Sequence, residues 1–241
     1  MRSAAGPPIG PSEHCKSELV RASPMLAALS PKVVDALLAV TSIEQAPARS
    51  LLLREGEPAE SLFLVLEGLV QIFTSAEGRQ ITLTIQRAPT LLPVDAICRD
   101  GPLLTSARVL QRTCVGRIGL ADARRLFATE REFADFVNRH LAARWDDLLR
   151  EVKNLRARTS FQRLVGWILA MHREVRGPIQ LPYDKAVLAA RLAMAPETLS
   201  RELARLSGLG VTVRGRKLDI ADARVLEELA GGNGPDLPPT P

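Results

Sequence analysis

Three side chains that could contact the edges of DNA bases occur close together near the C-terminal end of the chain: Glu197, Ser200 and Arg201. At helical spacing they lie on a face separate from the apolar face that Leu199 and Leu203 share. An arginine can donate two hydrogen bonds to a guanine, a glutamate can accept one from a cytosine amino group, and a serine can bond to either kind of edge. These residues predict a helix that binds in the major groove and distinguishes base sequences.

The surrounding residues predict the elements that would position this helix. A first helix is expected from about Asp184 to Leu192, and the second starts at Pro196, where a missing backbone N–H costs nothing, and ends before Gly208. A basic hairpin follows over 211–220, so the segment is typical of a winged helix-turn-helix. Six side chains are candidates to bind DNA phosphates: Lys185, Thr198, Arg205, Arg214, Arg216 and Lys217.

The charge distribution supports this interpretation. The chain carries 32 Lys and Arg against 27 Asp and Glu, a net charge of +5. Residues 155–230 hold 13 of the basic and 8 of the acidic residues, so the entire excess lies there, and the rest of the chain has 19 of each. Lys and Arg side chains that neutralise phosphates supply much of the affinity of proteins for DNA. The alternative interpretation is an ordinary helical hairpin whose charged residues face solvent.

A long helix without Gly or Pro is predicted from about Glu130 to Leu155. Its apolar residues recur at spacings of 4, 3, 4 and 3, which is the pattern of a coiled-coil seam. These residues are Leu141, Trp145, Leu148, Val152 and Leu155. Because charged residues cover the other faces, the apolar stripe needs a partner helix, and we expect a homodimer interface here. The alternative is a helix packed on its own domain.

Short strands are predicted between Ile43 and Ile118. Turns containing glycine separate them, among them Glu67-Gly68, which is expected to join the segments 62–66 and 69–73 as a hairpin. Evenly spaced strands of this kind indicate a small antiparallel β-roll of the jelly-roll type. The predicted fold class is therefore α+β. The predicted parts are a disordered arm over 1–16, a β-roll sensor domain over 17–128, a dimerisation helix over 129–156, a winged helix-turn-helix domain over 157–230 and a disordered tail over 231–241.

The roll offers few residues for catalysis or metal binding. Residues 43–118 contain no histidine, which argues against an enzyme with a metal site in the roll. The cysteines are too few for a four-cysteine cluster, and Cys98 and Cys114, in strand-like contexts, are expected to be buried thiols. No apolar run is long enough to span a membrane, and the N-terminus lacks the apolar core of a signal peptide. We therefore expect a cytoplasmic protein that is not an enzyme and has no membrane partner.

The order of roll, long helix and winged helix-turn-helix resembles the Crp/Fnr superfamily of bacterial transcription regulators, over about residues 17–225. The most specific motif is PETLSREL, residues 196–203, because the Fnr-like branch typically carries Glu-x-x-Ser-Arg there. The resemblance implies that Arg201 reads a guanine, that Glu197 accepts from a cytosine amine or an adjacent base, and that Ser200 contacts a thymine. It further implies a palindromic, TTGAT-like site, a phosphate contact by Lys185, and RNA polymerase as a partner.

The sensor half departs from the pattern of the members that bind cyclic nucleotides. These carry a Gly-Glu pair and an Arg-Ser or Arg-Thr pair, whereas the stretch 89–110 has no Gly-Glu, and Thr105-Ser106 stand where Arg-Ser would be. Cyclic AMP is therefore not expected. An Fnr-type iron–sulfur cluster is not expected either, because Cys15 is the only cysteine near the N-terminus.

The stretches 91–110 and 153–169 look most like the NnrR/FtrB-like subgroup, close to the Dnr proteins. Members of that neighbourhood are associated with nitric oxide and denitrification, and several with haem. A haem would need an axial ligand; the histidines available are His14, His140 and His172, and the candidate haem or sensor ligands are His140, His14 and Cys98. The remaining interpretations are thiol oxidation at Cys98 or Cys15 and a constitutive DNA-binding protein with an empty roll.

Overall fold

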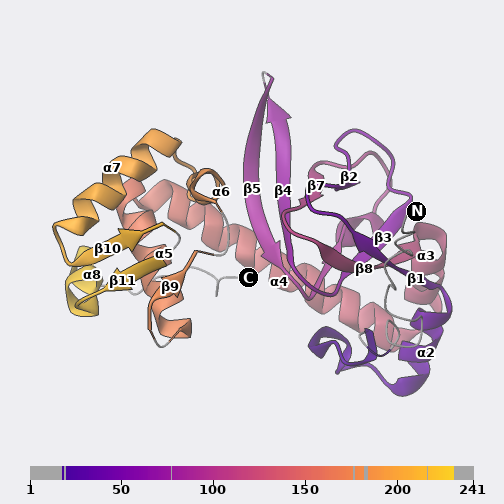
Figure 1. The fold of residues 1–241 in the computed structure, drawn as a ribbon. Helices are drawn as coiled ribbons and strands as arrows, with labels where there is room; N and C mark the ends of the chain where they lie inside the picture. The colour runs from indigo at the N-terminus through magenta and orange to yellow at the C-terminus, as the bar shows by residue number, and fades with distance from the viewer. Residues whose placement is uncertain are drawn as a thin grey trace, which may run out of the picture.

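The computed structural model describes residues 18–230, apart from residues 19, 77, 176, 182, 183 and 216. The expected arm and tail, together with His14, Cys15 and Arg216, lie outside the described residues. Figure 1 shows a β-rich N-terminal half and a mainly helical C-terminal half, with one long helix running between them.

The N-terminal half is an antiparallel roll of two four-stranded sheets. The first sheet contains, in spatial order, β1 (Thr41–Ala46), β8 (Thr113–Gly119), β3 (Ser61–Val65) and β6 (Thr90–Leu92). The second contains β2 (Leu51–Leu53), β7 (Ser106–Val109), β4 (Leu69–Ala76) and β5 (Arg79–Arg87). Every strand pair is antiparallel. The predicted α+β fold class with an antiparallel roll is confirmed.

Both faces of β3 are buried, which shows how the roll is stabilised. Phe63 and Val65 belong to one buried cluster with Ile72 of the other sheet. Leu62 and Leu64, on the opposite face, pack with a layer of short helices. These helices are η1 (Pro24–Leu26), α2 (Pro31–Ala39), η2 (Val94–Ile97) and α3 (Leu120–Thr129). Fully burying one such side chain contributes about 1.5–3 kcal/mol to the free energy of folding, so a strand buried on both faces stabilises the fold strongly.

The predicted hairpin at Glu67-Gly68 is wrong. β3 pairs with β6 and β8 in one sheet, whereas β4, which follows it directly, pairs with β5 and β7 in the other. Gly68 has a φ of 86° and redirects the chain between the sheets. A Cβ at this position would lie 2.6 Å from Thr113 Oγ1, so the close approach to β8 also requires glycine. Glu67 and Gly68 do lie at a turn as predicted, but turn residues do not indicate which sheet the next strand joins.

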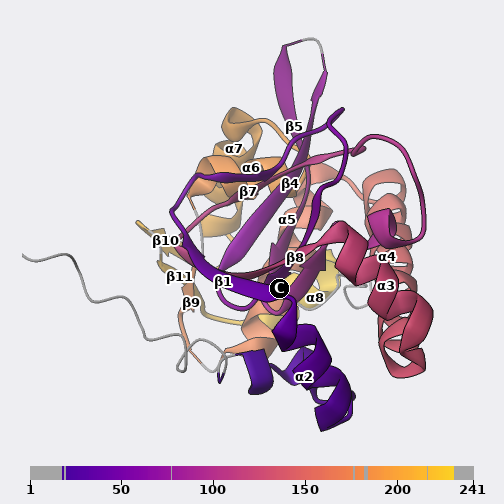
Figure 2. The same ribbon diagram turned by 90° about the vertical axis from the view of Figure 1, so that its right-hand side faces the viewer.

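The long helix α4 (Arg131–Ala157) has 27 residues and extends for about 40 Å. Its first turns pack on the roll through Phe133, Phe136 and Val137. Figure 2 shows α3 and α4 side by side next to the sheets. The second half of α4 leaves the roll and leads to the C-terminal half. None of the described helices combines the length and the apolar character needed to cross a membrane.

The C-terminal half contains α5 (Ser160–Glu174), β9 (Ile179–Gln180), α6 (Lys185–Arg191), α7 (Pro196–Ser207), β10 (Val211–Arg214), β11 (Lys217–Ile220) and α8 (Ala223–Leu229). A capping box starts α5: the Gln162 N–H donates to Thr159 Oγ1, and the Thr159 N–H donates to Gln162 Oε1. β9 pairs with β11 and adds a third strand to the wing, which the sequence does not indicate.

The core of the C-terminal half extends onto the roll. Leu69 and Ile85, from β4 and β5, belong to the same buried cluster as the core residues of α5 to α8. Arg191, at the end of α6, is only 6% exposed, and its Nη1 lies 3.4 Å from both Thr84 Oγ1 and the Ile85 carbonyl oxygen. Burial raises the pKa of the nearby Glu151 carboxyl on α4, although the charge of Arg191 partly offsets this. The β4–β5 hairpin therefore contacts the helix-turn-helix directly (Figure 1).

Candidate nucleic-acid interface and sensor cavity

The turn between α6 and α7 fixes the angle between these helices. Ala193 has a φ of 48°, and the Met194 N–H donates to the Ala189 carbonyl over 3.0 Å. Arg163 of α5 donates to the carbonyl oxygens of Leu192, at 2.8 Å, and Ala193, at 3.0 Å. A residue with a Cβ is unfavourable in the left-handed region, so these hydrogen bonds stabilise a conformation that the sequence alone would not favour.

The helix α7 exposes the three residues predicted to read bases. Glu197, Ser200 and Arg201 are all exposed, whereas Leu199 and Leu203 are buried. Glu197 lies in the first turn, where the helix dipole favours a carboxylate. The structure therefore brings the three predicted residues together on one free face of a supported helix.

Four of the candidate phosphate-binding residues are also exposed: Lys185, Arg205, Arg214 and Lys217. Lys185 begins α6, and Arg214 and Lys217 flank the turn between β10 and β11. Gly215 in that turn has a φ of 61°, which suits glycine.

Two of the candidates, Thr198 and Arg205, also contact other side chains of the protein. Thr198 Oγ1 accepts a 3.3 Å hydrogen bond from Arg201. The Arg205 guanidinium lies 3.9 Å from the centre of the Phe161 ring and 3.8 Å from a Glu202 carboxylate oxygen. Arg205 therefore also joins α7 to α5, a role that the sequence pattern does not indicate.

The predicted dimer stripe on α4 is exposed over most of its length. Trp145 is 64% exposed and Leu148 56%, and Val152 and Leu155 exceed 40%. Leu141 differs, because it is partly buried against the core of its own roll. Leu149 is a further exposed apolar residue of this helix that the heptad pattern leaves out.

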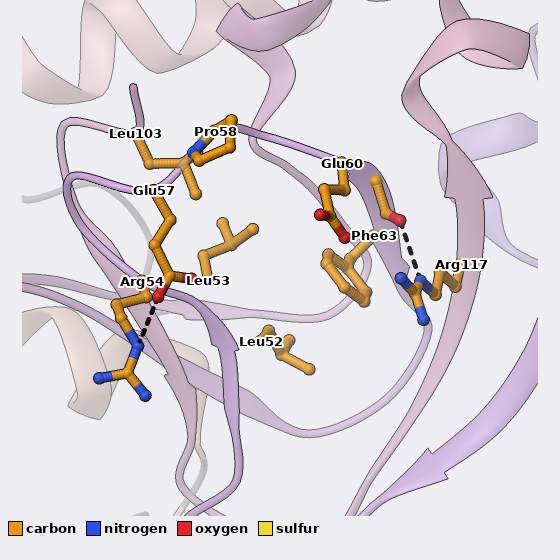
Figure 3. Close-up of a pocket in the computed structure, with 10 residues that line it drawn as sticks. Leu52, Leu53, Arg54, Glu57, Pro58, Glu60, Phe63, Leu103 and Arg117 are labelled. Carbon is orange, nitrogen blue, oxygen red and sulfur yellow. Dashed lines mark hydrogen bonds and ion pairs between the residues drawn. The ribbon is translucent and has the colours of Figure 1, made fainter. Parts of the chain in front are cut away.

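The roll contains a cavity of about 260 Å³ (Figure 3). It is lined by Leu52, Leu53, Arg54, Glu57, Pro58, Glu60, Ser61, Phe63, Leu103 and Arg117. Sequence reasoning did not find it, because the lining comes from four separate segments that only the sheet pairing brings together. None of these residues is a histidine or a cysteine, so the cavity offers no axial ligand for a haem iron.

The two arginines of the segment 89–110 are both engaged elsewhere. Arg99 pairs with Asp95 at 2.6 Å. The Arg108 guanidinium lies 4.7 Å from the centre of the Phe73 ring and donates to Gln80 over 2.9 Å, so it is held by the β4–β5 hairpin. Both arginines of this segment therefore have partners within the protein.

His140 and Cys98, the described candidates for haem ligands, lie in unlike environments. The imidazole of His140 stacks on Phe136, with 6.3 Å between ring centres, and its Nε2 accepts a 3.4 Å hydrogen bond from the Leu91 N–H. Burial, with the charge of Arg144, lowers the pKa of His140 to about 4.

Cys98 is exposed at the end of η2, so its expected burial is wrong, whereas Cys114 in β8 is buried. Cys98 leaves the core because it follows a short helix and does not lie in a strand. No group of side chains in the described ranges could hold a metal ion.

A winged helix-turn-helix connected by a long helix to a β-roll defines a DNA-binding regulator. Residues 43–130 match the family of the cyclic nucleotide-binding domain, and residues 162–229 match the Crp-like helix-turn-helix domain. The cyclic AMP receptor protein of Thermus thermophilus is 28% identical over 220 residues, which are 88% of this chain and 99% of that relative. The chain belongs to the Crp/Fnr family of transcription regulators.

Two solved structures show the same fold. The c-di-GMP-responsive global regulator CLP of Xanthomonas campestris has a TM-score of 0.71 at 19% identity, covering 80% of this chain and 100% of that one. FixK2 of Bradyrhizobium japonicum has a TM-score of 0.69 at 20% identity, covering 81% and 100%. At these identities the likeness concerns the architecture alone.

Proposed function

We propose that this regulator acts as a homodimer and binds a palindromic, TTGAT-like DNA site with α7 of each protomer. The observation that carries the proposal is the free face of α7, on which Glu197, Ser200 and Arg201 are exposed together. Arg201 reads a guanine, and Glu197 and Ser200 contact neighbouring bases. This motif supports a place in the Fnr/Dnr-like branch, nearest the NnrR/FtrB-like subgroup. At its promoter the dimer acts on RNA polymerase.

The exposed stripe on α4 supports the dimer. Apolar side chains such as Trp145 and Leu148 are rarely left in water in a row along one helix, and a second copy of α4 would cover them. Two recognition helices would then lie about 34 Å apart, which is one turn of DNA.

Replacing Arg201 by alanine tests the recognition surface. We expect Arg201→Ala to lose discrimination at one guanine by about 1–3 kcal/mol, because a bidentate pair is removed. The measurement is competition binding against site variants with every base at each position. Arg224→Ala, which removes an exposed arginine from α8, is the matched control and should leave the base preference unchanged. An unchanged preference in Arg201→Ala would overturn the assignment of α7.

Lys185→Ala separates phosphate binding from base reading. We expect it to weaken all DNA sites about equally and to lower the slope of affinity against salt by ~1, because one phosphate contact is lost. A change in base preference would instead show that Lys185 contacts a base.

The signal is proposed to bind in the roll and to differ from cyclic AMP. The engagement of Arg99 and Arg108 supports this, since neither is free to bind a cyclic phosphate. A constitutive regulator with an empty or thiol-based roll is the alternative, and it predicts one DNA affinity for protein isolated under any condition. A haem-based nitric oxide sensor would instead show a Soret band that saturates on titration with hemin.

A further inference from the structure

Two side chains of opposite charge lie on the rim of the roll cavity without pairing to each other. Glu60 precedes β3 and Arg117 lies on β8, and both are exposed. The other charged pair on the rim, Arg54 and Glu57, is joined by a 3.0 Å ion pair. Within the described part of the chain, neither Glu60 nor Arg117 takes part in any ion pair. Figure 3 shows their side chains on the same side of the cavity, near Phe63.

A buried hydroxyl lies beside Arg117. Ser61 is 6% exposed, lines the cavity, and its Oγ accepts a 2.9 Å hydrogen bond from Arg117 Nε. A hydroxyl that accepts this bond still has its own O–H to donate. Among the described residues no acceptor takes that proton, so Ser61 and Arg117 together form a donor pair suited to a carboxylate.

Part of the cavity wall is apolar, and the remainder is formed by charged and polar side chains. Leu52, Leu53, Phe63 and Leu103 lie in the apolar part, and the last three belong to the buried core between the sheets. An apolar cavity of about 150 Å³ holds benzene, so about 260 Å³ has room for an aliphatic or aromatic side chain with a few polar atoms at the mouth.

We propose that this cavity binds a free α-amino acid with an apolar side chain, of the size of leucine or phenylalanine. The ligand carboxylate accepts hydrogen bonds from Arg117 and Ser61, its ammonium group pairs with Glu60, and its side chain packs on Leu53 and Phe63. A ligand with only one of the two charges would pair with only one of Glu60 and Arg117. The zwitterion matches both. This inference deepens the proposal that a signal binds in the roll, and its test is separate from that of the DNA site because binding is measured without DNA.

The test is calorimetric titration of the full-length protein with L-phenylalanine and L-leucine. We expect saturable binding of one molecule per chain. Phenethylamine, which lacks the carboxylate, and 3-phenylpropanoate, which lacks the ammonium group, should each bind about tenfold more weakly or worse, because each loses one charge-assisted contact. No saturable binding of either amino acid up to about 10 mM would overturn the proposal.

Two variants assign the charges to their partners. Arg117→Gln should weaken phenylalanine about tenfold but leave phenethylamine unchanged, whereas Glu60→Gln should weaken phenylalanine and leave 3-phenylpropanoate unchanged. Arg87→Gln and Glu67→Gln, which change exposed charges of the roll outside the cavity lining, are the matched controls and should bind as the parent does. Phenylalanine binding that survives both cavity variants at full strength would also overturn the proposal.

Discussion

The buried imidazole of His140 makes a quantitative prediction about acid stability. Its folded pKa is lowered to about 4 from an ordinary value of 6.5, first by burial and then by the charge of Arg144. Between these two values the unfolded chain binds a proton that the folded chain does not, so stability must fall as the pH falls. For pKa values of about 6.5 and 4, linkage gives a loss of about 2 kcal/mol between about pH 7 and pH 4.5. Because the side chain is still partly exposed, we expect about 1–2 kcal/mol.

The assay is denaturant unfolding of the parent and of His140→Gln at about pH 7 and pH 4.5, at one protein concentration. Glutamine keeps an acceptor for the Leu91 N–H but does not titrate. Carboxylates titrate in both proteins, so the difference between the two pH dependences isolates His140. Equal pH dependences, or an NMR titration of His140 with a midpoint near 6.5, would refute the reasoning.

Three further perturbations follow from the packing. Gly68→Ala should lower the free energy of unfolding by about 2–4 kcal/mol, because alanine is unfavourable at a positive φ and its Cβ would lie 2.6 Å from Thr113 Oγ1. A loss below about 0.5 kcal/mol in denaturant titration would contradict this. Arg191→Met should cost about 1–2 kcal/mol, because it removes the donor to the Ile85 carbonyl oxygen and leaves Glu151 with Arg163 alone as a cationic neighbour; denaturant unfolding at neutral pH checks it. Leu148→Asp should sediment as a monomer and lose binding to a palindrome, whereas Asp146→Asn, an exposed change on the same helix, should not; a dimer of Leu148→Asp would remove the argument for α4.

Local patterns were enough to predict the helix α7 and its exposed face. Leucines at spacings of four and three, a proline at the start and a glycine at the end define α7 at Pro196–Ser207, with Glu197 and Arg201 on its free face. Both the periodicity and the capping signals act within one or two turns, so they can be read without knowing the rest of the fold.

The arrangement of the roll depends on long-range pairing and could not be predicted in the same way. β3 pairs with β8, more than fifty residues away, and its five residues are all buried, so no alternation indicates which face is the core. The cavity depends on this pairing, because Ser61 and Arg117 meet only across β3 and β8. The contact of His140 with Leu91 also joins distant segments, and its protonation follows from burial that the sequence does not show.

The shared core of Leu69 and Ile85 with α5 to α8 has a consequence for how such chains evolve and can be engineered. The DNA-binding half is not an exchangeable module, because part of its hydrophobic support is encoded more than seventy residues earlier in the β4–β5 hairpin. A chimera that grafts a foreign helix-turn-helix after α4 would expose this surface and leave Arg191's contacts unmade. A chimera should therefore fold only if the β4–β5 hairpin is transferred together with the helices. For the same reason, substitutions in one half of the chain limit which substitutions the other half tolerates.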